Sequence, residues 1–253
     1  MIIDVNTYIG HYPFRRLVNN TAEGLISVMD ASGIDKACVC NISGVYYRDV
    51  MTGNYELLEQ IHGYEDRLLP FCIWNPDYNG AEQDLLECIR LGFKGVRLFP
   101  KQHKYKLDNP LLSLCAEHRL PVQLTVFLED LRQRHPMDIT EPVSPQEVKE
   151  AVLSHPDVNF ILSNGHHQQY ASVLKGYSNV YYDLGRVENL GQFSFQSFYK
   201  NTDAEHILFG TGAPMQYTAP NLLKLHTLPM TDHLSDEEIE CISHRNIERL
   251  LSL

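Results

Sequence analysis

Two charged side chains lie near the ends of short apolar segments, where a parallel sheet places its chemistry. Arg97 lies near the end of the segment at 94–99, and Asp183 near the end of the segment at 180–184. A buried arginine usually clamps a carboxylate or phosphate, although an ion pair with Asp183 or Asp4 is the alternative. A buried Asp183 can act as a general acid or base with a pKa raised by burial. It can equally be the structural partner of an arginine or of a backbone amide.

Histidines and further arginines follow other apolar segments closely. His11, His103 and His166 lie just beyond three of them. Imidazole exchanges protons near neutral pH, so each is a candidate catalytic residue, although loop histidines often only cap or pack. The same three side chains are the candidate ligands of a rebuilt site for zinc or another divalent metal. Arg15 and Arg186 are candidates for holding an anionic substrate, and Arg15 can instead form a structural salt bridge.

The elements that must position these residues alternate along the whole chain. Apolar, β-rich segments are predicted as strands at Ile2–Thr7, Lys36–Ile42, Leu68–Trp74, Lys94–Phe99, Val122–Phe127, Asn159–Ser163, Val180–Leu184 and His206–Phe209. Amphipathic segments are predicted as helices at Ala22–Ser32, Tyr55–His62, Ala81–Leu91, Pro110–His118, Pro145–Ser154, Gln168–Leu174, Phe193–Lys200, Ala219–Leu225 and Asp236–Leu251. This order predicts an α/β protein with one domain over residues 1–253, a (β/α)8 TIM barrel. A doubly wound open sheet is the alternative, but no glycine-rich phosphate motif follows the first strand.

Helix ends have recognisable signals, and the longest polar connection has a predicted place. Ser144 before Pro145 and Ser235 before Glu238 are helix starts, and Gly33 suits a left-handed helix end. The carboxyl ends of barrel strands meet at one mouth, so the candidate residues should converge there. Residues 129–143 follow the fifth strand and should overhang that mouth as a functional lid.

Composition limits the partners and the location of the protein. The formal net charge is -11, which argues against nucleic acid and anionic membranes as partners but permits a small anionic ligand. No segment approaches the roughly 18 apolar residues of a membrane span, and the N-terminus lacks a signal-peptide pattern. The six cysteines are scattered without a CxxC pair, which favours reduced, buried thiols in a cytoplasmic protein.

Nine segments in order resemble the amidohydrolase superfamily, specifically the amidohydrolase 2 group of metal-dependent barrel hydrolases and decarboxylases. They are IIDVNTYIG, MDASGIDKACV, LLPFCIWNP, GFKGVRLFP, RLPVQLTV, HPDVNFILSNG, NVYYDLG, ILFGTGAP and NIERLL. The resemblance covers nearly the whole chain and implies a TIM barrel. A homodimer is a further expectation at the level of the family.

The residues that the resemblance assigns to metal binding and catalysis are replaced. The family's His-x-His falls on Asn6 and Tyr8, and its later histidines fall on Thr125 and Asn164. The acidic residue of its Gly-Thr-Asp motif falls on Gly212, and Phe99 stands where many members have histidine. Such side chains are weak ligands or none, so no catalytic metal is predicted. The residues Asn6, Tyr8, Thr125 and Asn164 should line the pocket floor as substrate-binding groups, or form a polar plug in the former metal cavity.

Three functional hypotheses follow. In the first, an enzyme acts without a metal on a small anionic substrate that is carboxylated or lactone-like. His11 or Asp183 would move protons, and Arg97 with Arg15 would hold the anion. In the second, a non-catalytic descendant of the family binds a metabolite or a partner protein at the same mouth. In the third, a rebuilt histidine site holds a divalent metal.

Overall fold

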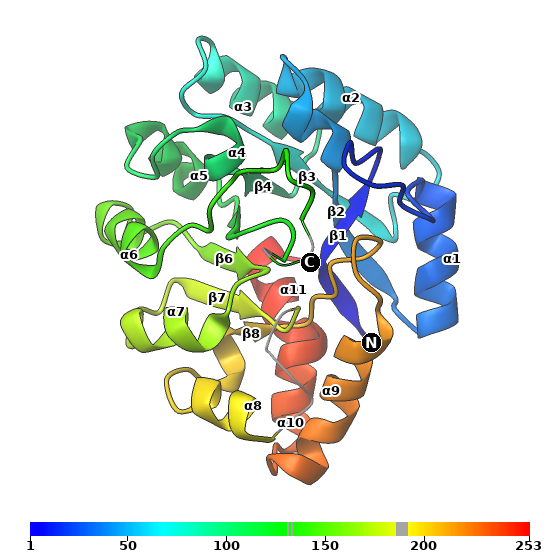
Figure 1. Ribbon diagram of the computed structural model, residues 1–253, viewed down its shortest axis with the longest axis vertical. Helices are drawn as coiled ribbons and strands as arrows, with labels where there is room; N and C mark the ends of the chain where they lie inside the picture. Colours follow the sequence, from blue (N-terminus) through cyan, green and yellow to red (C-terminus); the bar gives the residue numbers. More distant parts are fainter. Residues whose placement is uncertain (131, 133, 186–191) are drawn as a thin grey trace.

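Parallel strands form a closed barrel in the computed structural model, which describes residues 1–130, 132, 134–185 and 192–253, without the side chains of 192–194. The strands are β1 Ile3–Ile9, β2 Lys36–Asn41, β3 Leu68–Ile73, β4 Gly95–Leu98, β5 Val122–Thr125, β6 Phe160–Ser163, β7 Val180–Asp183 and β8 Ile207–Leu208. Each pairs with the next in sequence (Figure 1). Closure between the last and first strands comes from the Val5 N–H donating to the Phe209 carbonyl at 2.9 Å and the Tyr8 N–H donating to the Ala213 carbonyl at 2.8 Å. The predicted (β/α)8 barrel is confirmed.

Helices surround the strands, as Figure 1 shows. The α-helices are α1 Ala22–Ser32, α2 Val50–Gln60, α3 Ala81–Arg90, α4 Pro100–His103, α5 Ser113–Glu117, α6 Pro145–Ser154, α7 His167–Val173, α8 Gln192–Tyr199, α9 Ala219–Thr231, α10 Asp236–Glu240 and α11 Asn246–Leu251. Short helical turns lie at η1 Ile42–Tyr46, η2 Pro110–Leu112, η3 Ala204–His206 and η4 Cys241–Arg245.

Several helices differ from their predicted bounds, most of them by one residue at an end, and α2, α9 and the final helix differ more. Helix α2 begins at Val50 rather than Tyr55, because the Asp49 side chain accepts a hydrogen bond from the Met51 N–H and caps the helix. Helix α9 continues past Leu225 to Thr231 although it contains a proline. The predicted final helix is interrupted by the π-helical turn η4. The capping signals at Ser144, Ser235 and Gly33 are confirmed.

The barrel interior is layered from one end to the other. One end is filled by apolar side chains, including Ile3, Val5 and Phe71. The other end, where the strands terminate, holds a second apolar cluster that includes Tyr8, Tyr12 and Met215. A buried polar layer from several strands shares this end of the barrel, and it contains the candidate site.

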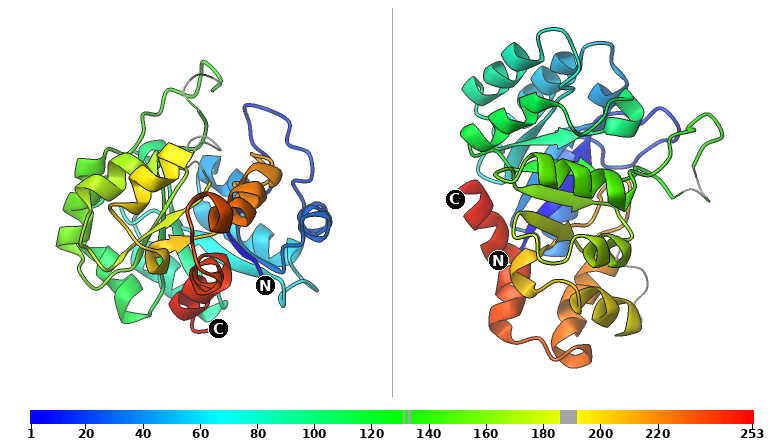
Figure 2. Two further views of the ribbon diagram at one scale, coloured as in Figure 1. Left: turned by 90° about the horizontal axis from the view of Figure 1, so that it is seen from below. Right: turned by 90° about the vertical axis from the view of Figure 1, so that its left-hand side faces the viewer.

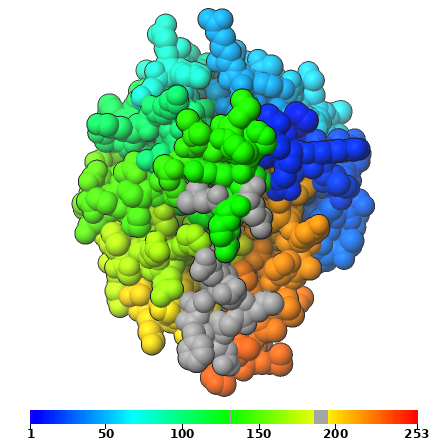
Figure 3. Space-filling model, viewed as in Figure 1, coloured from blue at the N-terminus to red at the C-terminus, as the bar shows by residue number. Residues whose placement is uncertain are grey.

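Two loops cover the end of the barrel at which the strands terminate. The loop after β1 and the segment 126–144 project from the same end of the molecule, away from α11 (Figure 2). The green segment of the lid lies across the centre of this face beside the N-terminal loop (Figure 3). Arg15 Nε lies 2.6 Å from Glu129 Oε1, and the ring of Phe14 stacks on His135 at 5.5 Å. The described residues of 129–143 therefore occupy the place predicted for a lid.

The cysteines and the hydropathy of the helices agree with the sequence analysis. All six cysteines are free, and all except Cys241 are buried. Burial raises the pKa of the Cys115 thiol to about 12, which keeps it protonated and unreactive. Within the described residues, no helix combines the length and the apolar character needed to cross a membrane.

Candidate functional site

Arg97 reaches from β4 across the barrel interior, and its side chain is fully buried. Its Nε donates to Thr125 Oγ1 at 3.2 Å, and its Nη1 donates to the Thr7 carbonyl at 3.2 Å. Its Nη2 donates to Asn6 Oδ1 at 2.6 Å and to the Tyr8 hydroxyl. The guanidinium carbon lies 3.9 Å from the centre of the Tyr8 ring, which adds a cation–π contact. The charge of Arg97 is thus surrounded by neutral acceptors.

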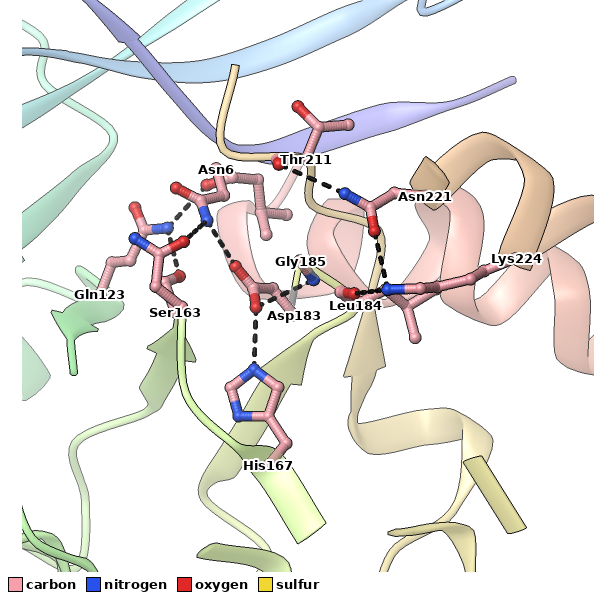
Figure 4. A network of polar contacts seen from close by, with 12 residues as sticks. Asn6, Gln123, Ser163, His167, Asp183, Leu184, Gly185, Thr211, Asn221 and Lys224 are labelled. Carbon is pink, nitrogen blue, oxygen red and sulfur yellow. Dashed lines mark hydrogen bonds and ion pairs between the residues drawn. The ribbon is translucent and has the colours of Figure 1, made fainter. Parts of the chain in front are cut away.

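Asn6 connects the arginine to a buried carboxylate. Its Nδ2 donates to Asp183 Oδ2 at 2.7 Å and to Asn164 Oδ1 at 2.9 Å, as Figure 4 shows for Asp183. The Asn164 amide then donates to the Tyr8 hydroxyl at 3.1 Å. The side-chain oxygen of Asn6, rather than its amide nitrogen, must face the arginine, because guanidinium only donates hydrogen bonds. Within the described residues Arg97 forms no direct ion pair with Asp183 or with Asp4, so that alternative interpretation of the sequence is wrong.

An irregularity in β1 places Asn6 inside the barrel. Pairing between β1 and β2 shifts register between Asp4 and Thr7. Strict alternation would direct Asn6 away from the interior, because Val5 already belongs to the interior apolar cluster. A bulge of this kind re-aims side chains and is frequent beside functional sites.

Asp183 is held on both carboxylate oxygens and has no exposed surface. His167 Nε2 lies 2.8 Å from Oδ1, and the Gly185 N–H donates to the same oxygen at 3.2 Å. Burial raises the pKa of Asp183, but the hydrogen bond and charge of His167, with the bond from Asn6, outweigh it and lower the pKa. The expectation of a raised pKa is therefore wrong, because burial here comes with hydrogen-bond donors.

Asp4 is the second buried carboxyl of the barrel. It accepts from the Asn6 N–H at 2.9 Å, from the Thr211 N–H at 3.0 Å and from the Thr211 hydroxyl at 2.5 Å. Burial outweighs these bonds and raises its pKa to about 7. The two carboxyls of the barrel therefore shift in opposite directions, because only Asp183 has a histidine partner.

Lys224 of α9 is a cation that approaches the same end of the barrel (Figure 4). Its Nζ donates to the Leu184 carbonyl at 3.3 Å and to Asn221 Oδ1 at 3.1 Å. Burial lowers its pKa to about 8, and the negative charge of Asp183 opposes that shift. Nothing in the spacing of the sequence singled out this lysine.

The remaining candidates lie apart from this cluster. His11 and Arg15 are exposed in the loop after β1, and Arg15 Nη2 donates to the Met215 carbonyl at 2.6 Å. His166 is exposed, with its ring 5.4 Å from that of Phe127. Arg186 lies outside the described residues.

His103 is partly buried on the outer side of the polar cluster. Its Nε2 lies 3.0 Å from the Val45 carbonyl, and its ring is 6.3 Å from those of Phe99 and Tyr105. Burial lowers its pKa, which favours neutral imidazole. Its contacts hold the ring by packing and one backbone bond.

Comparisons with known proteins identify the family. A family model described as Amidohydrolase matches residues 41–253. The chain belongs to the amidohydrolase 2 family. No curated protein matches its sequence.

Solved structures share the fold of this amidohydrolase at low identity. A 2,6-dihydroxybenzoate decarboxylase from Rhizobium superposes with a TM-score of 0.75 and 15% identity, covering 99% of this chain and 98% of that one. A dihydroxybenzoic acid decarboxylase from Polaromonas, solved with manganese and 2-nitroresorcinol, gives 0.76 and 14%, covering 100% and 97%. A probable 2-pyrone-4,6-dicarboxylic acid hydrolase from Acinetobacter baumannii, solved with citric acid, gives 0.64 and 14%, covering 100% and 99%.

The residues at the positions that the resemblance assigns to metal binding do not fit a divalent cation. Asn6, Tyr8 and Thr125 offer neutral oxygens, and all three already accept hydrogen bonds from the Arg97 guanidinium. A metal ion at these three residues would meet the positive charge of that guanidinium, and none of the three offers a carboxylate or an imidazole. Gly212 offers no side-chain ligand. Among the residues that the structure describes, no group of three or more His, Cys, Asp or Glu is arranged so that it could hold a metal ion, so His11, His103 and His166 form no rebuilt site.

His167 is the main residue of the cluster that the sequence analysis missed. The adjacent His166 was selected instead, but it is exposed whereas His167 is buried. A usable signal was present, because His167, Tyr170, Ala171 and Leu174 recur with helical spacing and are all buried. That pattern places His167 on the inner face of α7.

Proposed function

We propose that this amidohydrolase is a hydrolase or lyase that acts on a small carboxylated metabolite without a divalent metal. Family membership supports hydrolytic or decarboxylating chemistry. The similar structures from Rhizobium and Polaromonas are decarboxylases of dihydroxybenzoates, and the one from Acinetobacter baumannii is a probable hydrolase of a pyrone dicarboxylate. These compounds are small, anionic and carboxylated, which matches the substrate class predicted from the sequence.

The buried pair of His167 and Asp183 is the observation that carries the proposal. A carboxylate that accepts from one imidazole nitrogen fixes the ring and stabilises its protonated form, while the other nitrogen exchanges protons. Nε2 of His167 faces Asp183, and Nδ1 is buried with no hydrogen-bond partner among the residues that the structure describes. Such a pair suits proton transfer, which typically contributes about 10²–10⁴-fold to rate. Asp183 is proposed as a catalytic residue, and His167 is proposed as the group that exchanges the proton.

The other predicted residues take their proposed roles from their positions. Asn6 contacts Asp183 directly, Asn164 contacts Asn6, and Tyr8 and Thr125 contact Arg97. These four side chains are proposed to contact the substrate. Arg15 contacts the lid at Glu129. A substrate carboxylate could replace Glu129 as the partner of the Arg15 guanidinium. Arg186 is also proposed to bind the anion, and His11, His103 and His166 to assist proton transfer from the surrounding loops.

The test is turnover of a panel of hydroxylated aromatic carboxylates and lactone dicarboxylates, followed by mass spectrometry. Wild type should release carbon dioxide from, or add water to, at least one compound, with no loss of rate in excess chelator. Asp183→Asn and His167→Gln should each reduce kcat by about 10²-fold or more. Asp203→Asn is the matched control, because it breaks an exposed His–Asp pair with His206 at 2.7 Å. Turnover that is equal in Asp183→Asn and wild type would refute the proposed role.

A non-catalytic binding protein is the second candidate function, and one observation favours it. Each nitrogen of Arg97 already donates to an acceptor of the chain, so the guanidinium is not free to clamp a ligand. This arrangement matches the polar plug considered from the sequence. A compound that raises the Tm of wild type but is never consumed would select this candidate over the enzyme.

A further inference from the structure

We propose that the Arg97 guanidinium is a built-in cation that takes the place of the divalent metal of this family. Its Nε and Nη2 contact three side chains, those of Asn6, Tyr8 and Thr125. The family resemblance assigns all three positions to metal ligands. The Arg97 side chain, which comes from β4, thus lies between these three residues.

The chemistry of the surrounding groups suits a guanidinium rather than a metal. Guanidinium offers five N–H donors in a plane and accepts nothing, so its neighbours must be acceptors. The amide oxygen of Asn6, the hydroxyl of Tyr8 and the hydroxyl of Thr125 all accept from it. Neutral oxygens satisfy a single delocalised charge, whereas a divalent cation prefers imidazole or carboxylate ligands. The replaced residues and the arginine are therefore complementary.

The arginine also supplies positive charge near a buried carboxylate. Arg97 Nη2 lies 2.6 Å from Asn6 Oδ1, and Asn6 Nδ2 lies 2.7 Å from Asp183 Oδ2. Both charged side chains have no exposed surface. One amide therefore links opposite charges in a medium of low dielectric, where an uncompensated carboxylate is costly.

This role of Arg97 does not depend on turnover. It holds for an enzyme and for a non-catalytic protein alike, because it concerns what fills and stabilises the barrel centre. Its tests are metal binding and thermal stability, so they can fail while the proposed catalytic activity stands, and the reverse is also true.

Metal titration of wild type is the first test and needs no variant. Protein stripped with chelator is mixed with Mn²⁺ or Zn²⁺, and bound metal and Tm are measured. We expect no stoichiometric binding and the same Tm with and without metal. Binding of one equivalent that raises Tm in wild type and is lost in Asn6→Ala would overturn the proposal.

Chemical rescue of Arg97→Ala is the second test. Loss of the cation should lower Tm by roughly 10 °C or more, because the buried oxygens of Asn6, Tyr8 and Thr125 lose their donors and Asp183 loses a nearby positive charge. Millimolar n-propylguanidinium should restore part of that loss, whereas the neutral n-propylurea should not. Arg67→Ala is the matched control, because the three guanidinium nitrogens of Arg67 also all donate hydrogen bonds. Their acceptors are the Asp30 carboxylate and two backbone carbonyls, and the Arg67 side chain is partly exposed. Arg67→Ala should lower Tm by less than Arg97→Ala does, and n-propylguanidinium should not raise its Tm.

Two outcomes of the rescue experiment would overturn the proposal. One is an Arg97→Ala variant as stable as Arg67→Ala. The other is equal rescue by n-propylurea, which would show that filled volume matters and charge does not. Should Arg97→Ala fail to fold, Arg97→Lys and Arg97→Met replace it, because the two side chains are similar in size and only lysine carries a charge. Arg97→Lys should have the higher Tm, and an equal or higher Tm in Arg97→Met counts against the proposal.

Discussion

Nε2 of His167 lies 2.8 Å from Oδ1 of Asp183, and both side chains are shielded from solvent. Breaking such a buried pair leaves a polar group without its partner, which typically costs about 3–5 kcal/mol. We therefore expect Asp183→Asn to lower the free energy of unfolding by about that amount in urea denaturation. The exposed pair of Asp203 and His206 provides the control, where Asp203→Asn should cost below about 1 kcal/mol. Equal losses in the two variants would show that burial of the first pair has no energetic effect.

Asp4 makes the stability of the barrel depend on pH near neutrality. Its pKa rises from the ordinary 3.8 to about 7 on folding. The native protein therefore holds a proton that the unfolded chain has released, so stability falls as pH rises through this window. The lowered pKa of Asp183 reduces stability only when pH falls through the ordinary carboxyl range. That range lies below the pH range in which native Asp4 loses its proton.

The measurement is the free energy of unfolding of wild type and Asp4→Asn between about pH 5 and about pH 7. Wild type should lose of order 2 kcal/mol more than the variant over that range. Because Asp4→Asn removes one titratable group and leaves the others in the sequence, the difference between the two curves reports on Asp4. Parallel curves would contradict a raised pKa.

The barrel was predictable because its signals are local. Each strand is a short apolar run, each helix has its own periodicity, and the capping box at Ser144 needs only four residues. The predicted helix bounds that were wrong depend on less regular features. Asp49 starts α2 early by capping it, and the π-helical turn η4 interrupts the last helix.

The candidate site was predictable only in part because its partners are distant in sequence. Arg97, Asn6 and Asp183 were selected by their places near strand ends, and the structure brings them together. What Arg97 binds could not be predicted, because the bulge in β1 decides whether Asn6 faces inward. The direction of the Asp183 pKa shift likewise required knowing that His167 meets it.

The ion pair of Arg15 and Glu129 should restrain the motion of the lid. Arg15 also binds the Met215 carbonyl, so one side chain joins three loops at the barrel mouth. Because the Arg15 side chain is 44% exposed, Arg15→Met should change the free energy of unfolding by less than about 1 kcal/mol. It should nevertheless speed hydrogen exchange in residues 129–143 several-fold, since local opening needs little energy. Arg67→Met is the control that should leave exchange in the lid unchanged.

Gly210 tests how tightly the polar cluster is packed. A Cβ at this position would lie 2.8 Å from Asp183 Cβ and 3.1 Å from Asn6 Cβ. Gly210→Ala should therefore push these two residues apart and cost about 1–3 kcal/mol by overpacking.

Gly63→Ala is the control for this substitution, because its Cβ meets nothing within 4 Å and only its positive φ of 87° is strained. Both variants can lose stability, so the deciding measurement is the imidazole nitrogen NMR signal of His167. That signal should shift in Gly210→Ala, where the carboxylate of Asp183 moves, and stay unchanged in Gly63→Ala. An unshifted signal in Gly210→Ala would mean that the backbone around Gly210 yields before the His167–Asp183 pair does.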